Sequence, residues 1–173
     1  MGNEVENIID PSLTKKFKRA DILAFETELL KMDGAFVGDT ANCPLRHTFS
    51  DGIYVREIFL PKGVTVVGKI HKHDHPNFLR VGQVIVATEN GLETITAPCS
   101  MISPAGTKRV VHALQDCIWV TVHTNPTNTK DLVKIEDHVI AKSYDEYDKF
   151  KKGYNRAGKN RLLSFIYKLL KKK

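Results

Sequence analysis

The chain has 173 residues, of which 42% are apolar and 27% are charged. This size and composition fit one globular domain with an extension, and they exclude collagen-like, low-complexity and disordered classes. No run approaches the roughly 18–20 continuous apolar residues of a membrane span, and the acidic N-terminus lacks the apolar run of a secretory signal. The scattered Cys43, Cys99 and Cys117 predict buried free thiols in a reducing compartment rather than a disulfide framework.

The excess positive charge of the chain lies at its C-terminal end. The formal net charge is +6, but nine of the 26 Lys and Arg residues lie in residues 151–173, which contain no Asp or Glu. The other 150 residues carry 17 basic and 20 acidic side chains. All of the excess positive charge therefore belongs to one tail.

The N-terminal part predicts a helix followed by a loop. Residues 12–32 carry apolar side chains at roughly helical spacing, with Asp10 or Ser12 as a possible cap and Asp33-Gly34 as the end. Residues 35–51 contain Gly and Pro and predict a loop with a short strand.

From Gly52 onward, short β-rich runs alternate with turn residues, which is typical of a sandwich or barrel. Asn90-Gly91 predicts a two-residue hairpin turn. Two helices are expected after the strands, at 144–150 and 160–172. We expect strands at 53–60, 64–71, 78–88, 92–96, 100–103, 110–114, 118–124 and 131–142.

Three histidines alternate in the segment His71, His73 and His75. Residues i, i+2 and i+4 of a strand point to one face, so all three imidazoles would reach the same side of a sheet and present nitrogen ligands to one divalent metal. A bulge would turn one of the three away, and His73 is the least secure ligand if a loop begins at Asp74. We therefore expect His71 and His75 to hold the metal, with His73 or His123 completing the set, unless His123, which ends a predicted strand, lies at the rim. The alternative for these histidines is a buried polar cluster or an exposed strand face.

This histidine segment and a later turn resemble the two sequence motifs of the cupin superfamily. His71-Lys72-His73 matches the His-x-His of the first motif and Gly82 matches its glycine, while His75 stands where the family has glutamate. Pro104-Ala105-Gly106 matches the second motif, in which Arg109 stands where the family has histidine. The resemblance implies a mainly β fold, a cupin-like jelly-roll barrel, with a divalent transition metal inside.

More narrowly, the chain is similar to small cupin-like proteins of tailed bacteriophages, which implies a location in the host cytoplasm or the virion. The matching segments are residues 46–49, 52–57, 68–71, 103–109 and 119–123. We therefore expect a barrel at 52–142, preceded by a helix and loop at 1–51 and followed by a helical basic tail at 143–173.

Arg109 is the informative departure from the cupin pattern. A guanidinium beside a divalent cation is unfavourable unless an anion lies between them. Arg109 therefore indicates either an anionic ligand that bridges metal and arginine or a site that has lost its metal. Lys108 and Arg80 are further candidates for this anion pocket, and a basic pair at the surface is the alternative.

The basic tail predicts an amphipathic cationic helix at 160–172. Such a helix can dock on a virion protein, another protein partner or a second copy of the chain, pack on its own barrel, or contact nucleic acid or an anionic membrane. The residues expected to contact a partner are Arg161, Phe165, Ile166, Lys168 and Leu169.

The leading functional hypothesis is a phage-encoded cupin-like protein that binds a partner through this tail and carries a metal site in its barrel. The competing hypothesis is a metal-dependent enzyme, an isomerase, dioxygenase or lyase, that acts on a small anionic substrate held by Arg109. A metal-free structural barrel is the third interpretation.

Overall fold

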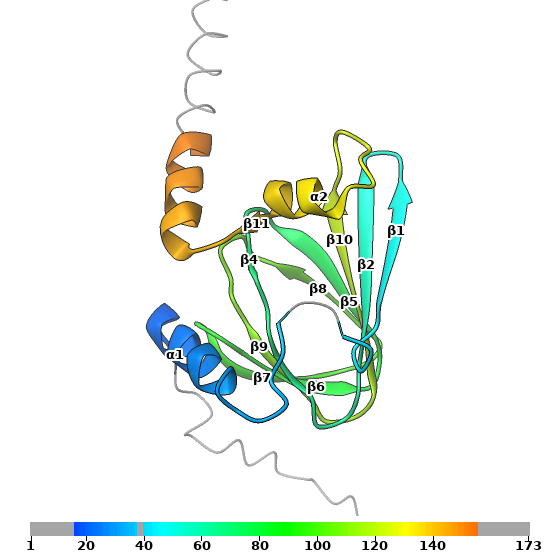
Figure 1. Ribbon diagram of the computed structural model, residues 1–173, viewed down its shortest axis with the longest axis vertical. Helices are drawn as coiled ribbons and strands as arrows, with labels where there is room; N and C mark the ends of the chain where they lie inside the picture. The colour runs from blue at the N-terminus through cyan, green and yellow to red at the C-terminus, as the bar shows by residue number, and fades with distance from the viewer. Residues whose placement is uncertain (1–15, 38–39, 156–173) are drawn as a thin grey trace, which may run out of the picture.

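The protein is built mainly from antiparallel β-strands, with helices at the two ends of the described chain and one near the top of the sheets (Figure 1). The structure is a computed structural model that describes residues 16–37 and 40–155. The predicted tail helix at 160–172 and its five partner-contacting residues lie outside the described residues. Within the described ranges, no helix has the length and apolar character needed to cross a membrane.

The N-terminal helix α1 spans Arg19–Leu29 and is shorter than the predicted 12–32. It begins at Arg19 because Lys18 has an extended backbone and its N–H donates to the Asp21 carboxylate over 2.7 Å. Residues 16–18 are not helical, and residues 12–15 lie outside the described residues.

Two large antiparallel sheets pack face to face. The five-stranded sheet has the order β1 (Leu45–Ser50), β2 (Ile53–Leu60), β10 (Cys117–Thr124), β5 (His75–Val81) and β8 (Cys99–Ser103). The four-stranded sheet has the order β3 (Thr65–Val67), β9 (Val110–Ala113), β6 (Gln83–Thr88) and β7 (Gly91–Thr96). A small third sheet joins β11 (Ile140–Ala141) to β4 (Ile70–His71).

The order of the strands is that of a jelly roll. From β2 to β10 the chain passes back and forth between the sheets, so that β2-β10-β5-β8 face β3-β9-β6-β7. Eight antiparallel strands divided in this way between two sheets form the double-sheet jelly roll. No strand pair in the described ranges joins the two large sheets, so the jelly roll is not closed into a cylinder. The predicted mainly β, jelly-roll fold class is confirmed.

Two predicted long strands are each divided in the structure. The run at 78–88 becomes β5 and β6, separated by Gly82, whose φ is +87° and whose missing Cβ would collide with the carbonyl of Asp116. The run at 64–71 becomes β3 and β4. The predicted hairpin is confirmed, but Thr88 pairs with Gly91, so the two turn residues lie one position earlier than expected.

The predicted strand at 131–142 is wrong for most of its length, because Leu132–Val139 forms helix α2. The Asp131 carboxylate caps this helix by accepting from the backbone N–H of Val133 over 3.0 Å. Ile135 and Val139, which are four residues apart, are buried against the sheets, a helical spacing rather than a strand alternation. Only Ile140–Ala141 is a strand, and a helix at 144–155 then extends the one predicted at 144–150.

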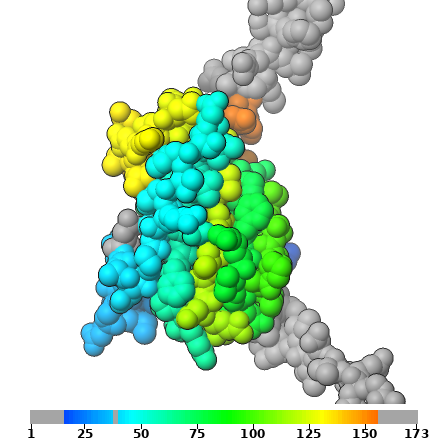
Figure 2. Space-filling model, turned by 90° about the vertical axis from the view of Figure 1, so that its right-hand side faces the viewer, coloured from blue at the N-terminus to red at the C-terminus, as the bar shows by residue number. Residues whose placement is uncertain are grey.

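The space between the sheets is apolar at one end and polar at the other. The apolar end is filled by ten buried residues: Cys43, Leu60, Leu79, Val84, Val86, Ile95, Val111, Ala113, Cys117 and Trp119. Figure 2 shows the opposite, outward face of the five-stranded sheet, with β1 and β2 in cyan beside β10 in yellow-green. The buried polar residues between the sheets include His75, Asn77, Ser103, Thr121 and His123.

Candidate metal centre

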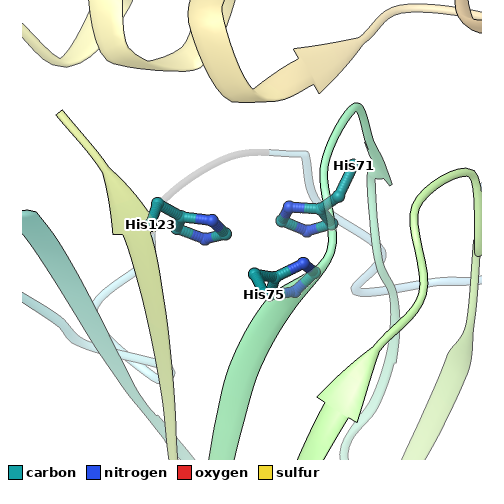
Figure 3. Close-up of side chains that lie close together, drawn as sticks. All are labelled: His71, His75 and His123. Carbon is teal, nitrogen blue, oxygen red and sulfur yellow. The ribbon is translucent and has the colours of Figure 1, made fainter. Parts of the chain in front are cut away.

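Three histidines meet at the polar end of the jelly roll. His71 ends β4, His75 begins β5 and His123 lies near the end of β10, and their rings point toward one another (Figure 3). The ring centroids are 4.0 Å apart for His71 and His75, 4.7 Å for His75 and His123, and 5.0 Å for His71 and His123. One nitrogen of each ring lies within 4.8 Å of the other two.

The segment from His71 to His75 is not one continuous strand, contrary to the prediction. Residues 72–74 leave the β-structure, where the Asp74 carboxylate accepts from the N–H of Ala105 over 2.7 Å. Because the alternation is broken, His73 lies elsewhere, with its ring centroid 5.6 Å from that of His138 and 5.2 Å from that of Phe150. The structure therefore brings together His71, His75 and His123 and places His73 among the helices.

Hydrogen bonding leaves ring nitrogens available in this cluster. His75 Nδ1 lies 3.2 Å from the carbonyl oxygen of His73, so an N–H assigned to Nδ1 leaves the lone pair on Nε2. Within the described part of the chain, His71 Nδ1 is one of two buried side-chain polar atoms without a partner. A buried nitrogen without a hydrogen bond is costly unless another group binds it.

Burial keeps all three imidazoles uncharged. It lowers the pKa to about 2 for His71, about 4 for His75 and about 3 for His123. The mutual repulsion of the rings and the charges of Arg109 and Arg56 lower the pKa of His71 further. At neutral pH each ring is therefore in the deprotonated state that binds a metal.

The donor set fits a divalent transition metal. Neutral imidazoles suit Zn, Cu, Fe and Ni, and one nitrogen of each ring lies close enough to the other two for a shared ion. A bound ion would supply Lewis-acid polarisation of an oxygen-containing ligand. His71, His75 and His123 would hold such an ion.

Two further histidines, His47 and His112, have hydrogen-bonding partners of their own. His47 Nδ1 lies 2.7 Å from the hydroxyl oxygen of Tyr54, whose ring stacks on His123 with centroids 6.1 Å apart. His112 Nδ1 lies 2.8 Å from the hydroxyl oxygen of Thr65. Tyr54 thus lines one side of the centre, and the sequence analysis missed it because an aromatic residue on a strand carries no sign of which ring it faces.

Arg109 and Lys108, two of the predicted anion-binding residues, have different surroundings. Arg109 donates a hydrogen bond to Ser103 Oγ, and its guanidinium carbon lies 5.7 Å from the centroid of the Trp119 ring. Lys108 is buried in an ion pair with Glu26 of α1, at a distance of 2.8 Å. Arg109 therefore lies beside the histidines, while Lys108 joins α1 to the sheets.

Arg56 is a further charged residue near the centre. It lies on β2 opposite Thr121 of β10, and its charge lowers the pKa of His71 and of His123. Arg56 is not among the residues that the sequence predicted for the site. The alternation along β2 was the signal that could have placed it, because it puts Arg56 on the same face as Tyr54.

Solved structures similar to the chain include cupin-superfamily proteins. One is a cupin superfamily protein from Desulfitobacterium hafniense, with 9% identity over 51% of this chain and 83% of the other and a TM-score of 0.43. KdgF from a Halomonas species has 12% identity over 58% and 94%, with a TM-score of 0.46. Ectoine synthase from P. lautus has 15% identity over 65% and 81%, also with a TM-score of 0.46. No protein-family model and no curated protein matches the chain.

Proposed function

We propose that this chain is a cupin-type protein whose jelly roll holds one divalent transition metal through His71, His75 and His123. The observation that carries this proposal is the convergence of three imidazoles from three strands, half-buried His71 and buried His75 and His123, with nitrogens within 4.8 Å of one another. Three ligands that leave a coordination position open are the arrangement of metal centres that also bind a further ligand.

Electrostatics supports a metal over a purely structural polar cluster. A structural cluster is normally satisfied by internal hydrogen bonds, yet the buried Nδ1 of His71 has no partner among the described residues. The lowered pKa values also mean that these rings do not pair as charged donors at neutral pH. A metal ion that accepts lone pairs from three uncharged rings accounts for both the missing hydrogen-bond partner of His71 and the lowered pKa values.

The test is the metal content of the full chain prepared without an affinity tag, because a histidine tag binds the same ions. After equilibrium dialysis against zinc, cobalt, nickel or manganese, elemental analysis should find about one equivalent of at least one of them. Less than about a tenth of an equivalent of every metal would contradict the proposal.

We propose as the wider role a partner-binding protein of a tailed bacteriophage, attached to a virion component through the basic tail. The support is the sequence resemblance and the charge of residues 151–173. If the protein is found in purified particles and is lost from them when residues 151–173 are deleted, this role stands. Unchanged association after the deletion would remove the docking role of the tail.

The alternative is a metal-dependent enzyme acting on a small anionic substrate. The position of Arg109 beside the histidines favours it, because a fixed cation next to an ion with an open position can orient an anion. Absence from particles, together with turnover of an organic acid by the metal-loaded protein, would favour the enzyme over the virion role.

A further inference from the structure

Arg109 reaches from one sheet to the inner face of the other. It precedes β9 of the four-stranded sheet, while its two side-chain contacts, Ser103 and Trp119, belong to the five-stranded sheet. Ser103 of β8 pairs directly with His75 of β5. The guanidinium therefore lies beside His75, between the apolar core and the three histidines.

The charge of Arg109 has no carboxylate partner in the described part of the chain. Three arginines nearer the surface, Arg19, Arg46 and Arg80, each lie within ion-pair distance of an Asp or Glu. Arg109 instead meets a neutral hydroxyl and an aromatic ring. Burial lowers its pKa to about 10, which leaves it charged at neutral pH.

A buried cation without a counter-ion is costly, and a divalent metal next to it increases the cost. The three imidazoles are neutral, so they offset neither charge. The group of close-lying metal-binding side chains in the described residues contains no Asp or Glu. A negative charge from a ligand would offset both cations at once.

We propose that the centre binds a small carboxylate, with one oxygen-bearing end on the metal and the carboxylate on the guanidinium of Arg109. This inference rests on the proposed metal function. The planar guanidinium presents parallel N–H donors that match a carboxylate, and Ser103 and Trp119 fix its orientation. Lys108 does not contribute to this ligand site, because Glu26 neutralises its charge.

A ligand that contacts both cations couples the two binding events. Metal must then strengthen carboxylate binding, and carboxylate must strengthen metal binding by the same factor. Because a metal with an open position also binds a carboxylate by itself, the role of Arg109 is measured by the loss of this coupling in Arg109→Gln. The coupling is therefore measurable without knowing the natural ligand or any reaction.

The experiment uses the tag-free full chain loaded with cobalt(II), with glycolate as the carboxylate probe and inorganic phosphate as the comparison. Glycolate should change the visible cobalt spectrum and the fluorescence of Trp119, which is the single tryptophan. In Arg109→Gln the glycolate affinity should fall at least about tenfold, while cobalt binding is retained. Arg109→Lys keeps the charge but loses the parallel N–H donors of the guanidinium. Its glycolate affinity should therefore lie between those of wild type and Arg109→Gln.

Arg80→Gln is the matched control, because Arg80 lies on the outer face in an ion pair with Glu57 and is 58% exposed. It should bind glycolate as the wild type does. Equal glycolate affinity in wild type and Arg109→Gln would overturn the inference, and so would phosphate binding that is tighter than glycolate binding and depends on Arg109.

Wild-type protein alone can still overturn the inference if Arg109→Gln does not fold, and Arg109→Lys then measures the part of the coupling that depends on the guanidinium. Cobalt affinity, corrected for complexation of free cobalt by glycolate, should rise when glycolate is present, and an unchanged affinity would overturn the inference. If the wild type binds no cobalt or other transition metal, the proposed metal function and this inference both fall. If it binds cobalt but shows no coupling, only the carboxylate inference falls.

Discussion

The imidazole rings of His71 and His75 lie with centroids 4.0 Å apart, although the three residues between them leave the β-structure. The chain leaves β4 of the small sheet at His71 and enters β5 of the five-stranded sheet at His75. The turn at 72–74 therefore directs the two rings to one point while His73 points elsewhere, which a continuous strand would not do.

The metal-free protein should lose stability as the pH falls from about 6.5 toward 4. The pKa of His75 is 6.5 in the unfolded chain and about 4 in the fold, so between these values the unfolded state binds more protons. The full contribution of neutral His75 to the free energy of unfolding is present above pH 6.5, and its pKa shift corresponds to roughly 3 kcal/mol. Urea unfolding at several pH values should show a steeper decline for wild type than for His75→Gln, and parallel curves would contradict the assignment.

Substitution of Glu26 should destabilise the protein without weakening metal binding. Glu26→Gln leaves the buried Lys108 ammonium without a counter-charge, which should cost about 2 kcal/mol of unfolding free energy. Lys108→Met removes the charge itself and should cost less. The surface pair Lys31–Glu28 provides the control, since Lys31→Met should change stability by less than about 0.5 kcal/mol.

Loss of glycolate affinity in cobalt-loaded Lys108→Met, at unchanged fold and unchanged cobalt binding, would return Lys108 to the anion-binding role that the sequence predicts. Isothermal titration with glycolate distinguishes this outcome from a purely structural effect.

Gly106 should be far less tolerant of alanine than Gly34, although both have a φ of +81°. A Cβ at Gly106 would overlap the ring of Tyr147, which anchors the helix at 144–155, whereas a Cβ at Gly34 meets open space. We expect Gly34→Ala to cost about 1 kcal/mol and Gly106→Ala about 3 kcal/mol, because only the second adds a collision to the backbone strain. Equal losses in thermal unfolding would show that the contact with Tyr147 is unimportant.

The alternation of apolar residues was enough to predict most of the strands. Residues 53–60 form β2 as predicted, and 92–96 and 118–124 form most of β7 and β10. The helix α2 was missed because its eight residues are few for a periodicity to emerge, and because the capping role of Asp131 was overlooked. Local pattern therefore predicted a sandwich or barrel, and the resemblance to cupins implied the jelly roll, but neither predicted helix α2.

Only part of the site could be predicted, because local spacing shows neither where a strand is interrupted nor which strands pair. His71 and His75 were named correctly as neighbours, but the pattern assumed one strand, which would have placed His73 with them. The contribution of His123 depends on the pairing of β10 with β2 and β5, a contact between residues far apart in sequence. Spacing along the chain does not encode such a pairing.

Zinc affinity in a matched pair of variants, His75→Ala and His73→Ala, tests the central claim most directly. Competition with a chromogenic chelator in the tag-free chain should show at least a 100-fold loss for His75→Ala, since removal of even an outer partner of a ligand costs about 10–100-fold. His73→Ala, two residues away, should bind zinc within about threefold of wild type. Equal losses in the two variants, or wild-type affinity in His75→Ala, would contradict a metal centre formed by His71, His75 and His123.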